Sequence, residues 1–174
     1  MSDQSIFIVG LMAVGKSTVG RLLAQALGYE FFDTDHEIEK RAGANIAWIF
    51  DVEGEAGFRE RETQVLDDLT SRPAVVVATG GGAVVRQENR CMLAARGCVL
   101  HLDSPLERLL ERTAKDRKRP LLQHVDRAAT LTRLREERDP LYQEIADYRF
   151  LTDRQTPKTL VRDIVRQLKE DSIV

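Results

Sequence analysis

The sequence VGLMAVGKSTVGRLLAQALG, residues 9–28, joins a short apolar run to a helical pattern through a glycine-rich segment. Within it, residues 10–17 fit the pattern G-x-x-x-x-G-K-[ST], which is typical of loops that bind nucleotide phosphates. Glycine lets such a loop curl until several backbone N–H groups face an anion, and the following helix adds its positive N-terminal end. We expect Lys16 to reach the β- and γ-phosphates and Ser17 to hold Mg²⁺.

The residues on both sides of this loop supply the structural context that the motif requires. Residues 5–9 form a run rich in β-branched and aromatic residues, which predicts a buried strand. From Ser17 to Leu27 the apolar residues recur at the spacings of one helix face. Gly28 follows at the position where a left-handed residue commonly ends a helix. The order of strand, loop and helix therefore supports a phosphate-binding loop.

Strand and helix patterns alternate along the rest of the chain. Short apolar-rich runs predict further strands at residues 29–32, 74–78, 98–102 and 149–152. The longest predicted helix covers residues 127–146 and is expected to bend or break near Pro140. Strands that are apolar throughout are typical of an α/β fold, with a parallel sheet covered by helices on both faces. The length of 174 residues predicts one domain, residues 1–174.

Polar or glycine-rich segments directly follow four predicted strands, at residues 10–17, 33–35, 79–82 and 103–105. Ligands of parallel α/β folds bind beyond the carboxyl ends of the strands, so we expect these segments to share one rim. Asp33 and Asp35 are spaced so that one carboxylate faces a metal-bound water and the other a substrate hydroxyl. The alternative is an ordinary polar strand end or a helix N-cap. The Thr-Gly-Gly-Gly segment allows close approach of backbone to ligand, or is a flexible turn.

Three segments combine arginines with acids: FRERE at residues 58–62, RDPLY at residues 138–142, and the basic tract at residues 108–119. Taken alone, arginines in the first two segments are more often solvated helix faces with weak ion pairs. The basic tract lacks the interleaved aromatic residues that are typical of nucleic-acid binding. A flap that brings positive charge over a nucleotide fits it better, and a solvated loop is the alternative.

The composition excludes several classes of protein. There are 26 Lys and Arg residues against 28 Asp and Glu residues, so a global basic field for nucleic acid is absent. No apolar run approaches the roughly 20 residues of a membrane span, and the first ten residues lack a signal-peptide pattern. Cys91 and Cys98 make neither a disulfide framework nor a metal site, which favours a reduced, cytoplasmic protein. No exposed apolar seam stands out, so we expect a monomer.

Taken together, these segments resemble the shikimate kinase family. The resemblance covers nearly the whole chain and rests on six ordered motifs: GLMAVGKSTVGR at residues 10–21, FFDTD at 31–35, IFDVEGEAGFRERE at 49–62, TGGGAV at 79–84, RPLL at 119–122 and RDPLY at 138–142. Many families share the phosphate loop, whereas the whole set in this order is specific. The resemblance implies a three-layer α/β/α P-loop kinase fold with a five-stranded parallel sheet and a mobile lid at about residues 112–125.

The resemblance also implies an activity: the ATP-dependent phosphorylation of the 3-hydroxyl of shikimate, with Mg²⁺, in aromatic amino-acid biosynthesis. Ser17 and Asp33 would hold the magnesium ion, Asp33 through water. Asp35 would hydrogen-bond the shikimate hydroxyls and act as the base. The implied catalytic residues are Lys16, Asp35 and Arg119, of which Arg119 would swing in on the lid.

The binding residues that the resemblance implies fall into two sets. The shikimate set contains Asp35, Arg59, Gly80, Gly81, Gly82 and Arg138. Its two arginines would clamp the carboxylate, its glycine N–H groups would complete the pocket, and Phe50 and Phe58 would form apolar walls. The nucleotide set contains Gly10, Ala13, Val14, Gly15, Lys16, Ser17, Thr18, Arg112, Arg119 and Gln155. Within the nucleotide set, Arg112 would lie against the adenine.

Two positions depart from the family pattern: Ala13 replaces a common glycine, and Gln155 stands where an arginine is frequent, with Arg154 adjacent. Two other functions remain as alternatives. One is a gluconate-type kinase on the same fold, against which the FR-x-x-E, TGGG and RDPLY segments argue. The other is a nucleotide-dependent accessory protein without transfer activity, against which the complete set of implied catalytic residues argues.

Overall fold

Five short parallel strands form the centre of the computed structural model, which describes residues 3–114, 126–153 and 155–174. The strands lie in the order β2-β3-β1-β4-β5. Their bounds are β1 (Ile6–Val9), β2 (Glu30–Asp33), β3 (Val75–Ala78), β4 (Cys98–Asp103) and β5 (Tyr148–Leu151). The three inner strands are buried along their whole length, as their apolar sequences predict, whereas the edge strands β2 and β5 are partly exposed.

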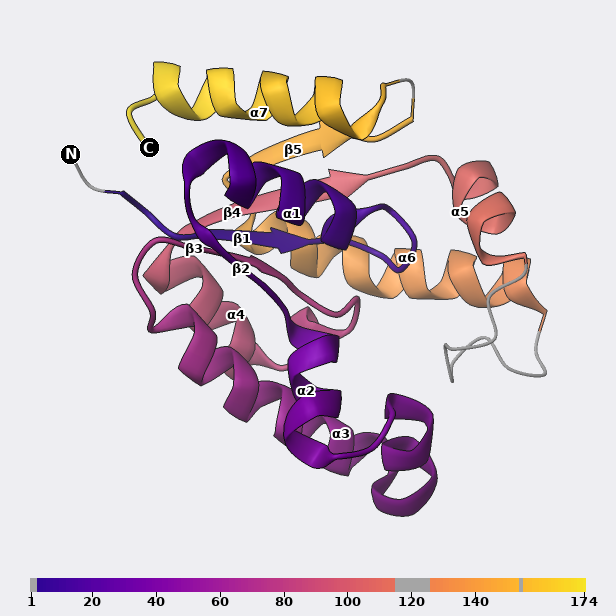
Figure 1. Ribbon diagram of the computed structural model, residues 1–174. Coiled ribbons are helices and arrows are strands. Elements are labelled where there is room, and N and C mark those ends of the chain that lie inside the picture. Colours follow the sequence, from indigo (N-terminus) through magenta and orange to yellow (C-terminus); the bar gives the residue numbers. More distant parts are fainter. Residues whose placement is uncertain (1–2, 115–125, 154) are drawn as a thin grey trace.

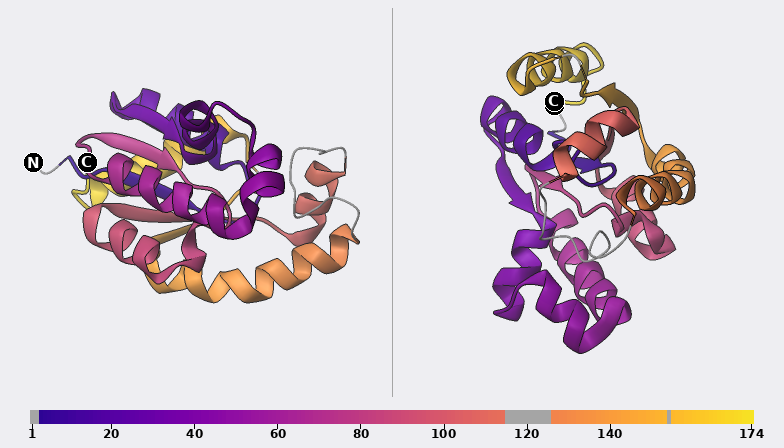
Figure 2. Two further views of the ribbon diagram at one scale, coloured as in Figure 1. Left: turned by 90° about the horizontal axis from the view of Figure 1, so that it is seen from below. Right: turned by 90° about the vertical axis from the view of Figure 1, so that its right-hand side faces the viewer.

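Helices cover both faces of this sheet (Figures 1 and 2). In order along the described chain they are α1 (Lys16–Leu27), α2 (Thr34–Ala42), α3 (Ile46–Thr70), the 3₁₀ helix η1 (Ala83–Val85), α4 (Gln87–Arg96), α5 (Leu106–Thr113), α6 (Arg127–Ile145) and α7 (Pro157–Glu170). Helices α1 and α7 pack together on one face, and α3, α4 and α6 lie on the other. The predicted three-layer α/β/α arrangement with a five-stranded parallel sheet is confirmed.

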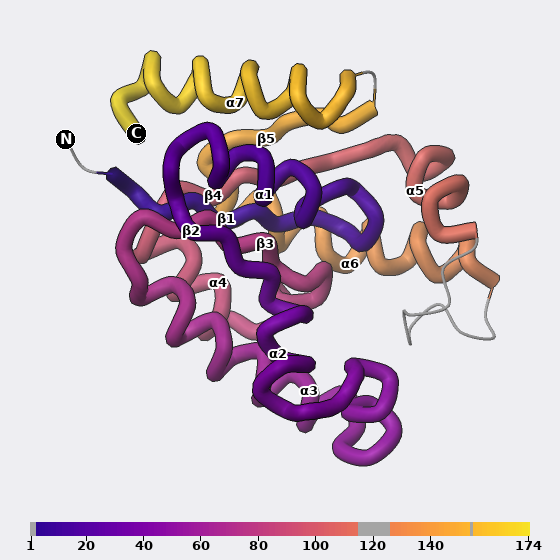
Figure 3. The backbone as a smooth tube through the Cα atoms, in the orientation of Figure 1, coloured from indigo at the N-terminus to yellow at the C-terminus, as the bar shows by residue number. Residues whose placement is uncertain are grey.

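The carboxyl ends of the strands meet at one edge of the sheet. Figure 3 follows the backbone from β1 through the glycine-rich loop into α1, and from β3 through the triple-glycine loop, at that same edge. Helix α1 ends as predicted, because Gly28 adopts a left-handed φ of 71° and its N–H bonds to Ala24 O. The first described residues and the C-terminus lie at the opposite edge of the sheet, away from this rim.

Helix α2 begins directly after β2. Asp33 is the N-cap of the helix, and its side chain accepts a hydrogen bond of 3.1 Å from His36 N. Asp35 therefore lies in the first helical turn rather than in a loop after the strand. The two carboxylates are consequently held by regular structure at the rim.

Helix α3 consists of two helical segments. Gly54 separates them with φ 73° and ψ 179°, a backbone conformation outside the helical region that glycine adopts without a steric penalty. The first segment, before Gly54, projects beyond the sheet together with α2 (Figure 1). It exposes the large side chains of Trp48 and Val52.

Helix α6 does not break at Pro140, contrary to one of the two predicted outcomes. It runs from Arg127 to Ile145 with the proline inside. Proline removes one backbone hydrogen bond of the helix. Buried side chains on both sides of the proline, Leu134 before it and Tyr142 after it, hold the helix against the rest of the protein. Tertiary packing thus outweighs the local preference.

Two predictions fall on parts of the chain without a description. Most of the predicted lid at residues 112–125, including Arg119, lies outside the described residues, and so does Arg154. Within the described ranges, none of the helices has the length and apolar character needed to cross a membrane.

Candidate active site

The phosphate loop between β1 and α1 requires unusual backbone angles. Gly10, Ala13 and Gly15 have positive φ values of 152°, 65° and 100°. A side chain at Gly10 would also collide with the backbone carbonyl of Leu102, so glycine is needed there for space as well as for conformation. Ala13 adopts the left-handed region without that freedom, which makes it the strained residue of the loop.

Lys16 lies under the curl of this loop. Its Nζ donates to the carbonyl oxygens of Gly10, at 2.6 Å, and Leu11, at 2.7 Å, and the residue is buried. The ammonium group therefore stays beside the N-terminus of α1, where the helix dipole and the loop N–H groups already favour an anion. This position suits contact with a phosphate group.

Ser17 and Asp33 come together across the neighbouring elements α1 and β2. The Ser17 hydroxyl donates to Oδ2 of Asp33, while Oδ1 of the same carboxylate caps α2. The interpretation of Asp33 as an N-cap is confirmed, and its role as a functional carboxylate stays a prediction. Hydroxyl and carboxylate oxygens suit Mg²⁺, which takes few protein ligands and completes its shell with water and phosphate. The described residues contain no cluster of three His, Cys, Asp or Glu side chains placed for a metal ion.

The triple-glycine loop after β3 is anchored at both ends. Thr79 donates from its N–H and its hydroxyl to Ile8 O on β1, at 3.0 and 2.9 Å. Gly80 N–H, which was expected to face a substrate, donates to the buried Thr34 hydroxyl at 2.9 Å. The predicted contacts between backbone N–H groups and the substrate therefore concern Gly81 and Gly82.

Charged groups from three helices crowd against this loop because it carries no side chains. A Cβ atom at Gly80 would lie 2.8 Å from Asp35 Oδ1 and 3.0 Å from Glu62 Oε2. A Cβ atom at Gly82 would overlap the Arg59 guanidinium, and one at Gly81 would lie 3.3 Å from Arg138 Nη1. The structure thus brings Asp35, Arg59 and Arg138 to the three glycines, as the sequence predicts.

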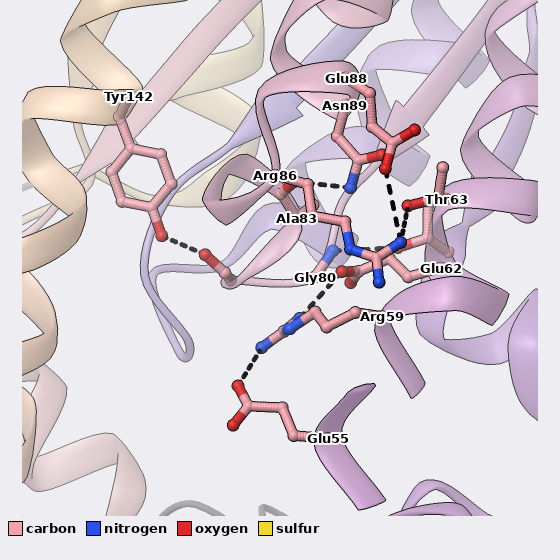
Figure 4. Close-up of polar contacts among 12 residues, drawn as sticks. Glu55, Arg59, Glu62, Thr63, Gly80, Ala83, Arg86, Glu88, Asn89 and Tyr142 are labelled. Atoms are coloured by element: carbon pink, nitrogen blue, oxygen red, sulfur yellow. Dashed lines mark hydrogen bonds and ion pairs between the residues drawn. The ribbon is translucent and has the colours of Figure 1, made fainter. Parts of the chain in front are cut away.

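Glu62 holds Arg59 in place, a role that was not assigned from the sequence. Arg59 Nη1 contacts Glu62 Oε1 at 2.8 Å, and its Nη2 contacts the exposed Glu55 at 3.4 Å (Figure 4). Glu62 has no exposed surface. Burial raises the pKa of Glu62, and the neighbouring Arg59, Arg138 and Arg86 only partly oppose that rise. The signal in the sequence was the spacing of three residues, which places both side chains on one helix face.

The remaining predicted residues occupy varied positions around the rim. Phe50 and Phe58 pack with ring centroids 4.8 Å apart, and Arg59 Cζ lies 5.2 Å from the centre of the Phe58 ring. Arg112 Nη1 donates to Ala13 O at 2.9 Å, so α5 touches the phosphate loop. Gln155 is exposed between β5 and α7.

The arrangement offers two adjoining regions for anions. One contains Lys16 and the N-terminal end of α1, beside the Ser17–Asp33 pair. The other contains the buried guanidinium groups of Arg59 and Arg138 at the triple glycine. Asp35 lies at the same loop and provides a carboxylate close to any group bound there. Such a site suits a phosphate chain beside a small carboxylate.

Comparisons with known proteins agree over almost the full chain. The sequence model of a family described as "Shikimate kinase" matches residues 12–169. A shikimate kinase of Chromohalobacter salexigens is 56% identical over 165 residues, which are 95% of this chain and 92% of that protein. The structure also resembles that of a shikimate kinase from Acinetobacter baumannii in complex with shikimate. That match has a TM-score of 0.95 and 48% identity, and covers 98% of this chain and 96% of the other.

A more distant structural match concerns the alternative substrate. A gluconokinase from Sinorhizobium meliloti has a TM-score of 0.62 and 20% identity, with coverage of 97% of this chain and 93% of the other. This level of identity shows a shared fold alone.

Replacement of Glu62 by Gln tests the cost of burying its charge. Because the pKa of Glu62 is raised in the folded protein, binding of its proton stabilises the fold. This stabilisation is complete below the ordinary pKa of 4.5 and is lost as pH rises through the raised pKa. We therefore expect the stability of the unsubstituted protein, relative to Glu62→Gln, to fall as pH increases from 4 toward 8. Urea unfolding across this range measures the difference. Glu55→Gln removes the exposed partner of Arg59 and is the matched control; an equal pH dependence there would contradict the assignment to burial.

Replacement of Ala13 by Gly tests the strain in the phosphate loop. Glycine removes a left-handed penalty of roughly 1–2 kcal/mol but loosens the unfolded chain, so we expect a net stabilisation of up to about 1 kcal/mol. The same change at Ala26, an exposed position inside α1, should instead destabilise by about 1 kcal/mol. Thermal or urea unfolding measures both. A destabilised Ala13→Gly protein would show that the alanine is not strained.

Proposed function

The chain belongs to the shikimate kinase family, and on that basis we propose that it transfers the γ-phosphoryl group of ATP to the 3-hydroxyl of shikimate. The observation that carries this proposal is the convergence of two buried arginines, Arg59 and Arg138, on the triple-glycine loop beside Asp35. Two guanidinium groups suit the single carboxylate of shikimate, and a carboxylate with backbone donors suits its hydroxyls. The relative from Acinetobacter baumannii, whose structure contains shikimate, supports the choice of substrate.

ATP would bind with its phosphates in the loop between β1 and α1. We propose that Lys16 turns from the carbonyls of Gly10 and Leu11 to the β- and γ-phosphates, which compensate its charge better than carbonyl dipoles. The remaining loop positions, with Thr18 at the start of the helix, would donate backbone N–H groups. Arg112 already touches the loop at Ala13 and would lie against the adenine, and Gln155 would line the base on its other side.

The oxygen donors at Ser17 and Asp33 fit a magnesium ion, with Ser17 as a direct ligand and Asp33 acting through water. When bound, the ion would neutralise charge on the β- and γ-phosphates. The hydrogen bond between the Ser17 hydroxyl and the Asp33 carboxylate keeps these two donors adjacent.

Asp35 would orient the shikimate hydroxyl and accept its proton as the new P–O bond forms. Its carboxylate lies against Gly80, and the residue belongs to the first turn of α2, which starts directly after β2. Phosphoryl transfer requires in-line positioning and charge neutralisation more than covalent chemistry from the protein. Arg119, outside the described residues, is proposed to supply positive charge to the transferring phosphoryl group. A monomeric state and a cytoplasmic location remain proposals.

Release of ADP, measured with shikimate, with gluconate and without an acceptor, tests this function directly. We expect release that depends on shikimate and requires Mg²⁺. Faster turnover with gluconate would contradict the proposed substrate. Binding of shikimate without ADP release from any mixture would favour the accessory-protein alternative.

Replacement of Asp35 by Asn tests the proposed base. The amide keeps the shape of the side chain but does not accept the proton, so we expect turnover to fall by roughly 10²-fold or more while ATP binding stays nearly intact. Asp51→Asn, an exposed position on α3, is the matched control and should leave turnover unchanged. Full activity of the Asp35→Asn protein would remove this residue from the mechanism.

A further inference from the structure

Tyr142 lies one helical turn after Arg138 on α6 and is completely buried. Its ring packs against the imidazole of His101 on β4, with the ring centroids 5.0 Å apart and the planes inclined by 34°. A ring enclosed in this way has little freedom at its side-chain torsions, so its hydroxyl occupies one position. That position lies beside the triple-glycine loop.

The Tyr142 hydroxyl contacts the triple-glycine loop of the proposed shikimate site. It donates to Gly81 O at 2.5 Å, a bond that Figure 4 shows reaching from α6 to the loop. The Arg138 guanidinium lies against the same residue of the loop, because its Nη1 is 3.3 Å from the position of a Cβ atom at Gly81. Tyr142 and Arg138, one helical turn apart on α6, therefore both face Gly81, and the phenol donates to its carbonyl.

The protonation state of Tyr142 maintains its hydrogen bond to Gly81 O. Burial raises the pKa of Tyr142, while Arg138 and Arg59 oppose the rise only in part. The phenol thus keeps its proton at neutral pH and continues to donate to Gly81. A phenolate would make that contact repulsive, because two oxygen acceptors would then face each other.

The bond to Gly81 O also fixes the direction of the next N–H group. The described chain has no cis peptide bonds, so the carbonyl of Gly81 and the N–H of Gly82 point in opposite directions. With the carbonyl directed at α6, the Gly82 N–H is directed away from α6. The guanidinium of Arg59, the second arginine proposed to bind the carboxylate, lies over Gly82. The contact of Tyr142 with Gly81 therefore orients a peptide group that lies beside Arg59.

We propose that the Tyr142 hydroxyl is a positioning group for carboxylate recognition, holding Arg138 and the Gly81–Gly82 peptide in one fixed relation. This inference rests on the proposed function and adds a residue that does not itself touch the substrate. Tyr142 acts through Arg138 and the loop. Loss of its hydroxyl should therefore weaken binding of the shikimate carboxylate and leave nucleotide binding at the phosphate loop unaffected.

Steady-state kinetics of Tyr142→Phe test this role. Loss of one buried hydrogen bond, with the Gly81 carbonyl left unsatisfied, should raise the KM for shikimate about tenfold. The kcat and the KM for ATP should stay within about twofold, because the groups that act on the phosphates are unchanged. An unaltered KM for shikimate would overturn the proposal.

A second substrate separates positioning from a general structural effect. The probe is a shikimate analogue in which hydrogen replaces the carboxylate. We expect Tyr142→Phe to reduce kcat/KM for shikimate about tenfold but to change kcat/KM for the analogue by less than twofold. Equal losses for both substrates would show that the tyrosine only supports the fold, and would overturn the proposal.

Two further variants complete the experiment. Tyr148→Phe removes a hydroxyl that donates to Asp171 at 2.6 Å, and as the matched control it should leave both substrates unaffected. If Tyr142→Phe does not fold, 4-fluorophenylalanine at position 142 fills the volume of the hydroxyl without donating a proton, and the same outcomes apply. A failure of the proposed function would appear separately, as absence of shikimate-dependent ADP release from the unsubstituted protein.

Discussion

The buried carboxylate of Glu62 is the constraint on which the proposed site depends. Arg59 and Arg138 carry two positive charges into the protein at one short loop, and unpaired charges of this kind cost several kcal/mol each. Glu62 reduces that cost through its contact with Arg59 at 2.8 Å and through its field at Arg138. An anionic ligand would add to this compensation, because guanidinium groups pair readily with a carboxylate. The two buried arginines thus favour the binding of an acid.

The parallel sheet brings this pocket next to the phosphate loop. Strands β1 and β3 are neighbours, so the loops that follow them leave the sheet side by side. Thr79 ties the second loop to β1 through Ile8 O, and Thr34 ties it to the start of α2. Short, buried hydrogen bonds of two threonines therefore fix the triple glycine beside the phosphate loop and Asp35. Such rigidity is what in-line transfer between two small ligands requires.

Local patterns were sufficient for a parallel α/β sheet and for the segments grouped at its rim, whereas the five-stranded three-layer arrangement and the roles of Arg59 and Arg138 came from the family resemblance. Strand burial, helix periodicity and glycine positions are encoded by neighbouring residues. The cap at Gly28 and the grouping of the segments after the strands are examples. Partners across the fold were less accessible. The capture of Gly80 N–H by Thr34 and the contact of Tyr142 with Gly81 join elements distant in sequence, and no local spacing indicates them. The unbroken helix at Pro140 likewise depends on tertiary packing.

The position of Trp48 has a consequence for spectroscopy. It is the sole tryptophan of the sequence, and its side chain is half exposed on the segment of α3 that precedes the Gly54 break. The tryptophan emission of the protein therefore comes from one place, outside the sheet and away from β1. Any movement of that segment about Gly54 would change the solvent exposure of this single indole ring. Trp48 is thus an intrinsic fluorescence probe, and rapid-mixing fluorescence can follow this segment without chemical modification.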